Sequence, residues 1–296
     1  MVASLTADPL TRVEFTHLSK VLYPEAGITK LEVIRYFIRI APKMLPLLAD
    51  RPVVLTRYPD GAGAPGFYEK DAPPGTPGWV ETFPHHSETA DRLIQYIVCN
   101  NLDTLLWLAN LDTLEIHVMF STTRSYTAPD LLFIDLDPEP PATTAEAATT
   151  ALLVRDRLAS QGVRISVKTS GKRGFHLVTP LVHGLTFQEV RAFIHDMSRD
   201  LAREHSFIAS EAPGPKNPGK VFVDYAMNGA GKTMVAPYSP RPTPRATVST
   251  PLSWEEMGKG IKPGDFHIQS VPDREEEPWK DLFLHPQRLP GGGREG

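Results

Sequence analysis

The stretch "LLFIDLDPEP", residues 131–140, places two carboxylates one residue apart at the end of an apolar run. In a β-strand, successive side chains point to opposite faces, so Asp135 and Asp137 share one face. Two carboxylates on a half-buried face repel each other unless a cation neutralises them, and oxygen ligands favour Mg²⁺ or Mn²⁺ over zinc. The alternative is a surface Asp135 on an edge strand and an Asp137 that opens a turn before Pro138. Short D-x-D motifs arise often by chance, so both interpretations stay open.

A third carboxylate lies in "KVFVDY", residues 220–225, where Phe222 and Asp224 share one face of a predicted strand. We expect this strand to be the last of a split βαβ sheet, in which at most one strand separates the first from the last. Asp224 is then close to Asp135 and Asp137. Three converging carboxylates could hold two divalent ions about 3.5–4 Å apart, an arrangement that serves in-line displacement at phosphorus.

A loop with two basic residues joins further predicted strands in "KTSGKRGFHLVTP", residues 168–180. Its glycines let backbone N–H groups approach an anion, Ser170 adds a hydroxyl donor, and Lys172 and Arg173 add positive charge. This composition suits a triphosphate, although it does not match the Walker pattern. The alternative is a glycine hairpin with exposed basic residues. For His176, on the following strand, we predict a structural or orienting role.

The segment "KVLYPEAGITK", residues 20–30, begins with Lys20 and ends with Lys30. Lys30 falls in the first turn of a predicted helix, where free N–H groups and the helix dipole favour an anion and disfavour a cation. We therefore predict that a phosphate binds between Lys20 and Lys30. The alternative is a solvated lysine that costs the helix roughly a few tenths of a kcal/mol.

Aromatic residues near flexible segments are candidate base-stacking groups. Phe67 and Tyr68 in "GFYEK" follow a glycine-rich loop and could stack on unpaired bases, although such pairs are usually core residues. His117 in "LEIHVMF" is similarly ambiguous, because most single histidines on apolar strands are packing residues.

The first half of the chain predicts a mixed α/β module. Thr29 and Glu32 form a capping box, and the helical spacing of apolar residues after them predicts a helix from about residue 30. Three β-rich runs, a helix and a strand follow, at 52–57, 67–70, 92–99, 101–110 and 114–120.

The second half predicts the order β-α-β-β-α-β. Capping boxes at Thr143 and Thr186 begin two helices with one apolar face each. The four strands are predicted at 131–137, 163–169, 174–180 and 220–225. This split βαβ arrangement is shared by ferredoxin-like and RNA-recognition-type domains, and it serves many functions.

Composition is that of a globular protein, with 41% apolar and 22% charged residues in 296. The net charge of −4 excludes little, because carboxylates in one place and cations in another cancel in a sum. Cys99 is the single cysteine and is predicted to be buried packing, which agrees with a reducing compartment. No apolar run is long enough to span a membrane, and the first residues lack the features of a signal peptide, so we expect a cytoplasmic protein.

Seven motifs in order resemble the polymerase domain of bacterial ligase D and its stand-alone relatives, which belong to the archaeo-eukaryotic primase superfamily and act in non-homologous end joining. These motifs are "SKVLYPEAGITK", "GFYEK", "LEIHV", "LLFIDLDP", "TSGKRGFHLVTPL", "KVFVDY" and "KTMVAPYSPR". The resemblance implies an α+β, primase-type fold. In it, an N-terminal α/β module (1–125) with the 5′-phosphate and template contacts would pack against an RNA-recognition-like catalytic module (126–288), followed by a flexible tail (289–296).

The same resemblance implies a polymerase that fills short gaps at DNA double-strand break ends and prefers ribonucleotides, with two Mn²⁺ or Mg²⁺ ions. By matching position, Asp135, Asp137 and Asp224 would be the catalytic metal ligands. The nucleotide-triphosphate contacts, for NTP or dNTP substrates, would be Ser170, Lys172, Arg173, His117, Arg241 and Lys232. Lys20 and Lys30 would bind the downstream 5′-phosphate, and Phe67 and Tyr68 would stack on the template.

The resemblance also implies partners: DNA with gaps or 3′-overhangs and a 5′-phosphate, Ku, and a DNA ligase, with association to the nucleoid during repair. Three positions depart from the usual residues of the family. Arg173 stands where lysine is frequent, Met227 where glutamine is common, and Asn217 where arginine is often found.

Three other functions compete with gap filling. A non-catalytic nucleic-acid-binding module would need basic and aromatic residues on the sheet face that here carries acids. A metal-dependent phosphoesterase or nuclease could use the same aspartates with water as nucleophile, but it would not need a triphosphate loop. A primase that starts chains without a primer is not separated from an extending enzyme by sequence.

Overall fold

The computed structural model describes residues 11–87, 91–211 and 218–290. The chain forms two compact units, and three segments build the first: Met1–Val118, Val235–Val248 and His267–Arg274. The remaining segments build the second unit. The chain thus returns twice to the first unit after residue 125, and no local sequence pattern announces these returns. These returns are held by non-local pairs such as the Thr247–His267 bridge and the hydrogen bond from Ala236 N to Ile116 O (2.8 Å).

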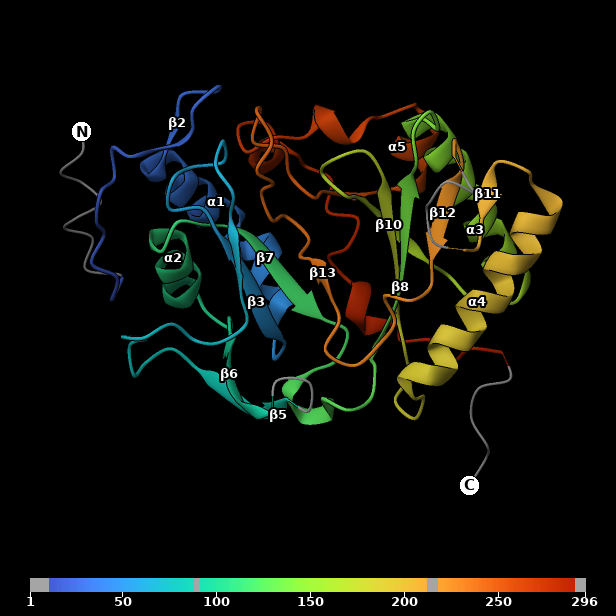
Figure 1. The fold of residues 1–296 in the computed structure, drawn as a ribbon, viewed down its shortest axis with the longest axis horizontal. Coiled ribbons are helices and arrows are strands. Elements are labelled where there is room, and N and C mark those ends of the chain that lie inside the picture. Colours follow the sequence, from blue (N-terminus) through green and yellow to red (C-terminus); the bar gives the residue numbers. More distant parts are fainter. Residues whose placement is uncertain (1–10, 88–90, 212–217, 291–296) are drawn as a thin grey trace. The chain divides into compact units, whose positions relative to one another are not determined.

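The first unit combines two helices with a twisted sheet (Figure 1). Helices α1 and α2 lie against each other. The sheet has the strand order β13-β7-β3-β6-β5, with β4 paired to β3, and a small ribbon pairs β1 with β2. The bounds are β1 Val21–Tyr23, β2 Ile28–Thr29, α1 Lys30–Leu48, β3 Pro52–Arg57, β4 Phe67–Glu69, β5 Thr82–Ser87, β6 Arg92–Val98, α2 Leu102–Asn110, β7 Thr113–Met119 and β13 Thr233–Val235.

The predicted start of α1 is confirmed. The Thr29 side chain accepts from Glu32 N, and the Glu32 carboxylate accepts from Thr29 N at 2.8 Å, which satisfies two N–H groups that a helix leaves unpaired. One face of α1 is buried throughout its length. The helix therefore begins one residue after its cap and delivers Lys30 in its first turn.

Strand β5 was not predicted, because "TFPHHS" looks like a polar loop. None of its residues is fully buried, and Pro84 cannot donate to a ladder. It forms by pairing along its whole length with β6, in a register from Thr82↔Ile97 to Ser87↔Arg92. An edge strand of this kind depends on its partner and not on its own composition.

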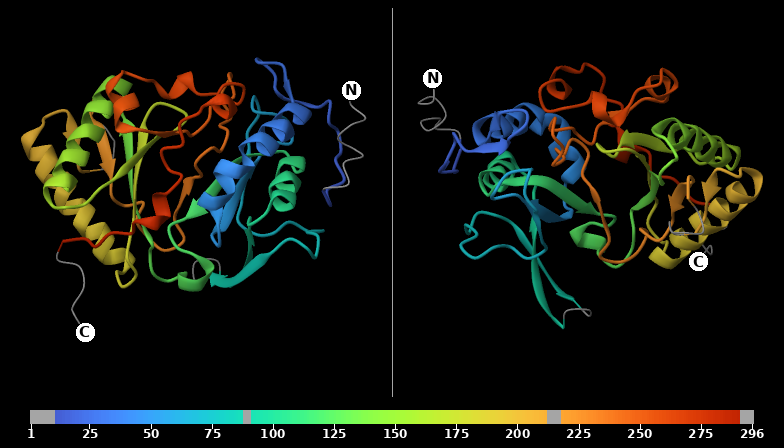
Figure 2. Two further views of the ribbon diagram at one scale, coloured as in Figure 1. Left: turned by 180° about the vertical axis from the view of Figure 1, so that it is seen from behind. Right: turned by 45° about the horizontal axis from the view of Figure 1, so that its top comes forward.

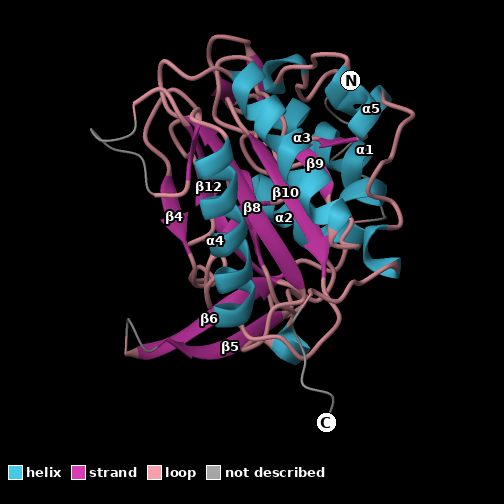
Figure 3. Ribbon diagram, turned by 90° about the vertical axis from the view of Figure 1, so that its right-hand side faces the viewer, coloured by secondary structure: helices cyan, strands magenta, loops and turns pink. Residues whose placement is uncertain are grey.

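The second unit holds a mixed sheet with the order β11-β12-β8-β10-β9-β14 and two long helices. Figures 2 and 3 show α3 and α4 side by side along strands β8, β10 and β12. The bounds are β8 Leu131–Pro138, α3 Thr144–Ser160, β9 Ser166–Thr169, β10 Phe175–Pro180, α4 Phe187–Glu204, β11 Ile208–Ala209, β12 Val221–Asp224, β14 Pro251–Leu252 and α5 Trp254–Gly258. Short 3₁₀ turns occur at Thr123–Ser125, Pro263–Asp265, Val271–Asp273 and Leu282–Leu284.

The β-α-β-β-α-β order is confirmed, with capping boxes at Thr143 and Thr186 as predicted. The first and last strands of this pattern, β8 and β12, are direct antiparallel neighbours. Leu132, Ile134 and Leu136 are fully buried on one face of β8, and the opposite face carries the two aspartates. The carboxylates therefore project from the face that does not carry the helices.

The apolar core explains the remaining predictions. Cys99 is fully buried, as expected, and burial raises the pKa of its thiol to about 12. Within the three described ranges, no helix combines the length and apolar character needed to cross a membrane. Leu289 is buried, so packing continues one residue into the segment assigned as a tail, and residues 291–296 lie outside the described part.

Candidate active site

Three polar side chains form a line across the second sheet. In the antiparallel registers, Asp224 on β12 lies opposite Asp135 on β8, and Asp135 lies opposite His176 on β10. Residues directly opposite each other share a face, so all three project from the same side. We call Asp224, Asp135, His176 and the next residue in register, Lys168 on β9, the cross-sheet row. The predicted proximity of Asp224 and Asp135 thus follows from direct strand pairing.

Asp137 belongs to the same face but lies off this row. It is two residues further along β8 and lies opposite Phe222 of β12. Its side chain is exposed. The alternative in which Asp135 sits on an edge strand does not hold, because β8 is paired on both sides. The Asp135 side chain is one-third exposed, and its Oδ1 lies 3.5 Å from His176 Nε2.

Burial sets the electrostatics of Asp224. Desolvation raises the pKa of its carboxyl, and this is only partly opposed by hydrogen bonds from the backbone of Ala226 and Met227 and by the charges of Lys232 and Arg191. The bond from Ala226 N to Asp224 Oδ1 is 2.8 Å long. A further positive charge nearby would stabilise the ionised form of this partly desolvated carboxylate.

These residues fit a divalent cation by their chemistry. The donors are carboxylate oxygens on one sheet face, which suits Mg²⁺ or Mn²⁺, and the buried charge of Asp224 is incompletely compensated. In the part of the chain that the structure describes, no three His, Cys, Asp or Glu side chains are gathered closely enough to enclose an ion as they stand. The donors are thus present, while the enclosure is not preformed.

The basic loop is organised around Ser170. Its Oγ accepts hydrogen bonds from Lys172 N (3.2 Å) and Gly174 N (3.1 Å), and Ser170 N donates to Gly174 O (3.0 Å). Two of the N–H groups that we expected to approach an anion are therefore turned inward. Gly174 cannot be replaced without movement, because a Cβ there would collide with the carbonyl oxygen of Leu136. The loop is thus fixed directly against the strand that carries Asp135.

Three cations of the second unit point to solvent. Lys172 and Arg173 are exposed at the tip of the loop, as in both interpretations of this segment. Lys232 is also exposed and close enough to Asp224 for its charge to oppose the raised pKa of that carboxyl. Lys232 therefore belongs to the electrostatic surroundings of the cross-sheet row.

In the first unit, the aromatic pair and His117 come together. Phe67 and Tyr68 are 43% and 50% exposed, so the usual core interpretation does not apply to them. The Arg57 guanidinium lies 5.1 Å from the centre of the Phe67 ring. His117 Nε2 is 3.2 Å from Thr56 Oγ1, and its ring meets that of Tyr68 edge-on at 5.6 Å. This patch offers two exposed aromatic faces supported by hydrogen-bonding and cationic neighbours.

Arg241 has a different neighbourhood from the one expected of a phosphate contact. Its Nε lies 2.9 Å from Glu115 Oε1, and both side chains are largely buried. Glu115 also accepts from the hydroxyl of Tyr58 at 2.7 Å. Burial, followed by the hydrogen bond and charge of Glu115, raises the pKa of Tyr58 well above its usual range. Arg241 is therefore already engaged with an internal carboxylate.

Lys20 and Lys30 converge, as predicted, but around a carboxylate. Lys20 Nζ lies 2.6 Å from Asp112 Oδ2, and Lys30 Nζ lies 2.8 Å from Asp112 Oδ1 and donates to Asn110 O at 2.7 Å. Lys30 is only 2% exposed, so the solvated-lysine alternative is wrong. Asp112 follows α2 with a left-handed φ of 61°. We call these three residues the lysine pair and its aspartate.

Sequence reasoning missed Asp112, Glu115 and Lys168. Asp112 and Glu115 act on residues about 80 to 130 positions away, and nothing in the local pattern links them to Lys20 or Arg241. A usable signal existed for Asp112, since aspartate directly after a helix often adopts a left-handed conformation. Asn217 lies outside the described residues.

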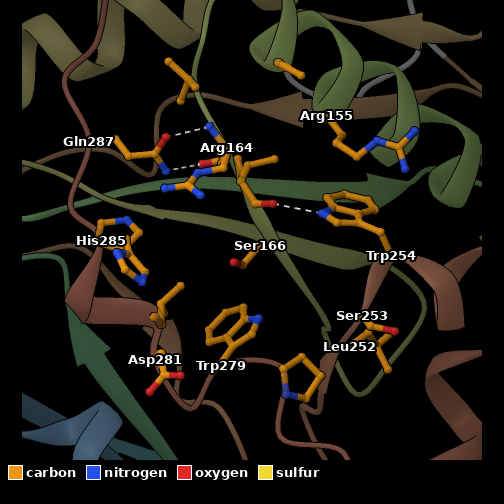
Figure 4. A pocket seen from close by; sticks show the side chains of 16 residues that line it. Arg155, Arg164, Ser166, Leu252, Ser253, Trp254, Trp279, Asp281, His285 and Gln287 are labelled. Atoms are coloured by element: carbon orange, nitrogen blue, oxygen red, sulfur yellow. Dashed lines mark hydrogen bonds between the residues drawn. The ribbon is translucent and has the colours of Figure 1, made fainter.

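The second unit also has an open cavity of about 610 Å³ that contains none of the predicted site residues. Figure 4 shows Arg155 beside Trp254, with its guanidinium 5.1 Å from the ring centre. Gln287 accepts from Arg164 N and donates to Arg164 O, both at 2.7 Å. These two bonds fix one wall of the cavity. No residue of the cross-sheet row lines it, so the cavity is separate from that row.

Comparison with known proteins gives a consistent family. The family model described as LigD, primase-polymerase domain, matches residues 29–283. The chain is 32% identical to the bifunctional non-homologous end joining protein LigD of Bacillus subtilis, covering 94% of this chain and 45% of that protein. It is also 32% identical to the multifunctional LigD of Pseudomonas aeruginosa, covering 94% of this chain and 34% of that protein. The chain thus spans less than half the length of these relatives.

A solved structure agrees with the sequence matches. The polymerase domain from Mycobacterium tuberculosis ligase D in complex with DNA superposes with a TM-score of 0.84 at 28% identity, covering 94% of this chain and all of that one. The predicted α+β, primase-type fold is thereby confirmed. Because the family model spans most of the chain and the fold agrees, this chain belongs to the LigD primase-polymerase domain family.

Proposed function

We propose that this protein is a template-directed nucleotidyltransferase that fills short gaps at DNA double-strand break ends during non-homologous end joining. The observation that carries the proposal is the direct pairing of Asp224 with Asp135 on the open face of the sheet, in a chain of the LigD primase-polymerase family. The family relation supports polymerase chemistry over hydrolysis. The acidic sheet face argues against simple nucleic-acid binding, because without a cation it repels phosphate.

Asp135, Asp137 and Asp224 would hold two divalent ions, which we propose to be Mn²⁺ or Mg²⁺. Such ions activate the primer 3′-hydroxyl and neutralise the charge of the triphosphate and its leaving group. The protein's own part is to hold the carboxylates in position. Asp135 and Asp224 are fixed by strand pairing, and Asp224 is further fixed by the bond from Ala226 N.

The nucleotide would be bound by groups that flank this site. Lys172, Arg173 and Lys232 are exposed cations of the second unit, and Ser170 keeps the loop that bears two of them in one conformation. The resemblance also implies His117 and Arg241 as nucleotide contacts. Arg241 would first have to exchange its ion pair with Glu115 for a phosphate. We propose a preference for NTPs over dNTPs on the family relation alone.

The DNA would be held by residues of the first unit that lie in the N-terminal module proposed for residues 1–125. Lys20 and Lys30 would bind the downstream 5′-phosphate, with Asp112 setting the net charge of that place at +1. Phe67 and Tyr68 present exposed rings on which template bases could stack. The similar structure from M. tuberculosis is a complex with DNA, which supports DNA binding by this fold.

Partners and location follow from the same proposal. A gap filler at broken ends works beside a protein that holds the ends and one that seals them, which we propose to be Ku and a DNA ligase. Relatives of this chain are named as end-joining proteins and are longer than it is. We place the protein in the cytoplasm, associated with the nucleoid during repair.

The test is primer extension on DNA with a short gap and a downstream 5′-phosphate, with Mn²⁺ and either NTPs or dNTPs. We expect extension by the wild type, stronger with NTPs, and none by Asp135→Ala or Asp137→Ala. The matched control is Asp200→Ala, which makes the same change at an exposed acid on α4 that forms an ion pair with Arg203. A wild-type protein that binds this DNA without extending it would show the proposal to be wrong.

A further inference from the structure

The cross-sheet row ends at a lysine that plays no part in the proposed function so far. Lys168 lies opposite His176 in the register of β9 and β10, on the face that carries Asp135 and Asp224. Its side chain is fully buried, with 0% exposed. A buried ammonium is costly unless it is well bonded, and an apolar side chain of similar length would fill the same space more cheaply. The cost of burying this ammonium beside His176 indicates that its hydrogen bonds have a role at the site.

Lys168 donates along two hydrogen bonds at its buried end. Its Nζ lies 2.5 Å from Ser249 Oγ and 2.7 Å from His176 Nδ1. The hydroxyl of Ser249 donates to Thr169 O at 2.8 Å, so the Ser249 oxygen serves as the acceptor for Lys168. An ammonium group has only donors, so His176 Nδ1 must be the acceptor. A ring that accepts at Nδ1 carries its hydrogen at Nε2.

The other side of the imidazole faces the proposed metal ligand. His176 Nε2 lies 3.5 Å from Asp135 Oδ1. The ring is also held edge-on against Phe133, with centres 5.1 Å apart, and Phe133 stacks on Phe120 at 5.0 Å. The aromatic contacts restrict the ring plane, but they do not distinguish its two nitrogens. The Lys168 ammonium group distinguishes the two nitrogens, because it can only donate a hydrogen bond.

We propose that Lys168 is a positioning residue: it holds His176 as the Nε2–H tautomer, with that hydrogen directed at Asp135, and thereby fixes the direction of the Asp135 carboxylate. The chain Lys168–His176–Asp135 resembles the outer partners that orient metal ligands elsewhere, whose loss typically costs about 10–100-fold in affinity or activity. The catalytic consequence rests on the function proposed above, whereas the tautomer of His176 does not.

The direct test is the hydrogen location on His176 in the whole protein, read from ¹H–¹⁵N correlation spectra of the imidazole nitrogens. The signals are assigned by their loss in His176→Gln. We expect hydrogen on Nε2 and a bare Nδ1 in the wild type. Hydrogen on Nδ1 in the wild type, whether the ring is neutral or doubly protonated, overturns the proposal without any further variant.

The second test removes the donor. Lys168→Met keeps an unbranched side chain one atom shorter and removes the donor. We expect it to give a mixture of both His176 tautomers and a kcat for primer extension about 10–100-fold lower, with a smaller change in the nucleotide KM. The matched control is Val167→Ala, which removes buried volume from the opposite face of the same strand. It is expected to lower stability while leaving the His176 spectrum and kcat close to wild type.

The outcomes separate this proposal from the proposed function. A wild type that extends no primer contradicts the function, yet its spectrum still decides the role of Lys168 at His176. A Lys168→Met protein that keeps a single Nε2–H signal, or that loses it with full kcat, contradicts the positioning role. A similar loss of kcat in Val167→Ala would show that the effect is one of stability alone, which also contradicts it.

Discussion

Two charged regions of this molecule are built in opposite ways. In the second unit, Asp135 and Asp224 lie opposite each other on neighbouring strands, and desolvation raises the pKa of Asp224. In the first unit, Lys20 and Lys30 lie within 2.6 and 2.8 Å of Asp112, so their charges are partly balanced inside the fold. The acidic region gathers like charges, whereas the basic region has its counter-ion in place.

The difference indicates how each region would respond to a ligand. Burial of a charge is unfavourable unless an opposite charge compensates it, so a cation at the acidic region would relieve a cost that the fold carries. At the basic region a phosphate would have to share two ammonium groups with Asp112, and only the net charge of +1 remains to attract it. We therefore expect metal binding to stabilise the protein and phosphate binding to be tuned by Asp112.

The largest effect is expected when a ligand of the acidic region is neutralised. Asp135→Asn keeps the size of the side chain and removes a charge, and we expect primer extension to fall about 10³-fold or more, as for loss of a principal electrostatic contact. In a thermal-shift assay, Mn²⁺ should raise Tm of the wild type and do so less for this variant. Equal Mn²⁺ stabilisation of both proteins would remove Asp135 from the metal site.

Gly174 tests how closely the loop of Ser170 packs against β8, the strand that carries Asp135. A methyl group there meets the Leu136 carbonyl, so Gly174→Ala must displace either the loop of Ser170 or strand β8. We expect a loss of about 3 kcal/mol in the free energy of unfolding, at the upper end for overpacking, measured by urea denaturation. Gly184→Ala is a control, since a Cβ at Gly184 meets no atom within 4 Å, although its φ of 123° adds backbone strain. A loss no larger than that of the control would contradict the close packing of the loop.

Local signals predicted most of the framework that positions these regions. The capping boxes at Thr29, Thr143 and Thr186 begin three helices as expected, because each bond pattern involves residues only three apart. The pairing of Asp224 with Asp135 could be predicted only to within one strand, since sequence order does not fix sheet order. Topology decides that, and here the first and last strands are neighbours.

Non-local partners could not be predicted in the same way. Lys168 lies in "VRISVKT", where alternation suggests an outward polar residue, yet it is fully buried and bonded to Ser249, 81 positions later. Asp112 and Glu115 compensate Lys30 and Arg241 across similar separations. A charge pattern in one segment does not reveal which distant segment balances it.

The basic region is tested by Asp112→Asn. With the internal counter-ion neutralised, the net charge of the lysine pair rises from +1 to +2, and we expect about 3–10-fold tighter binding of 5′-phosphorylated gapped DNA, with a steeper salt dependence. Fluorescence anisotropy over a range of salt concentrations measures both. Asp273→Asn is the matched control, because it removes the same charge from an exposed pair with Arg39. Weaker binding by Asp112→Asn would mean that the aspartate places the lysines and does not restrain them.

The smallest effect concerns the pH dependence of stability. The pKa of Asp224 is raised in the folded state, so the folded protein holds this proton more tightly than the unfolded chain does. Stability is then unaffected below the unfolded pKa and is lost as pH rises through the folded pKa. Asp224→Asn should therefore stabilise the metal-free protein at neutral pH by at most about 1 kcal/mol, because solvent still screens this carboxylate, and the gain should vanish near pH 3. A gain that persists unchanged at low pH would show that burial of this charge is not what distinguishes the acidic region from the basic one.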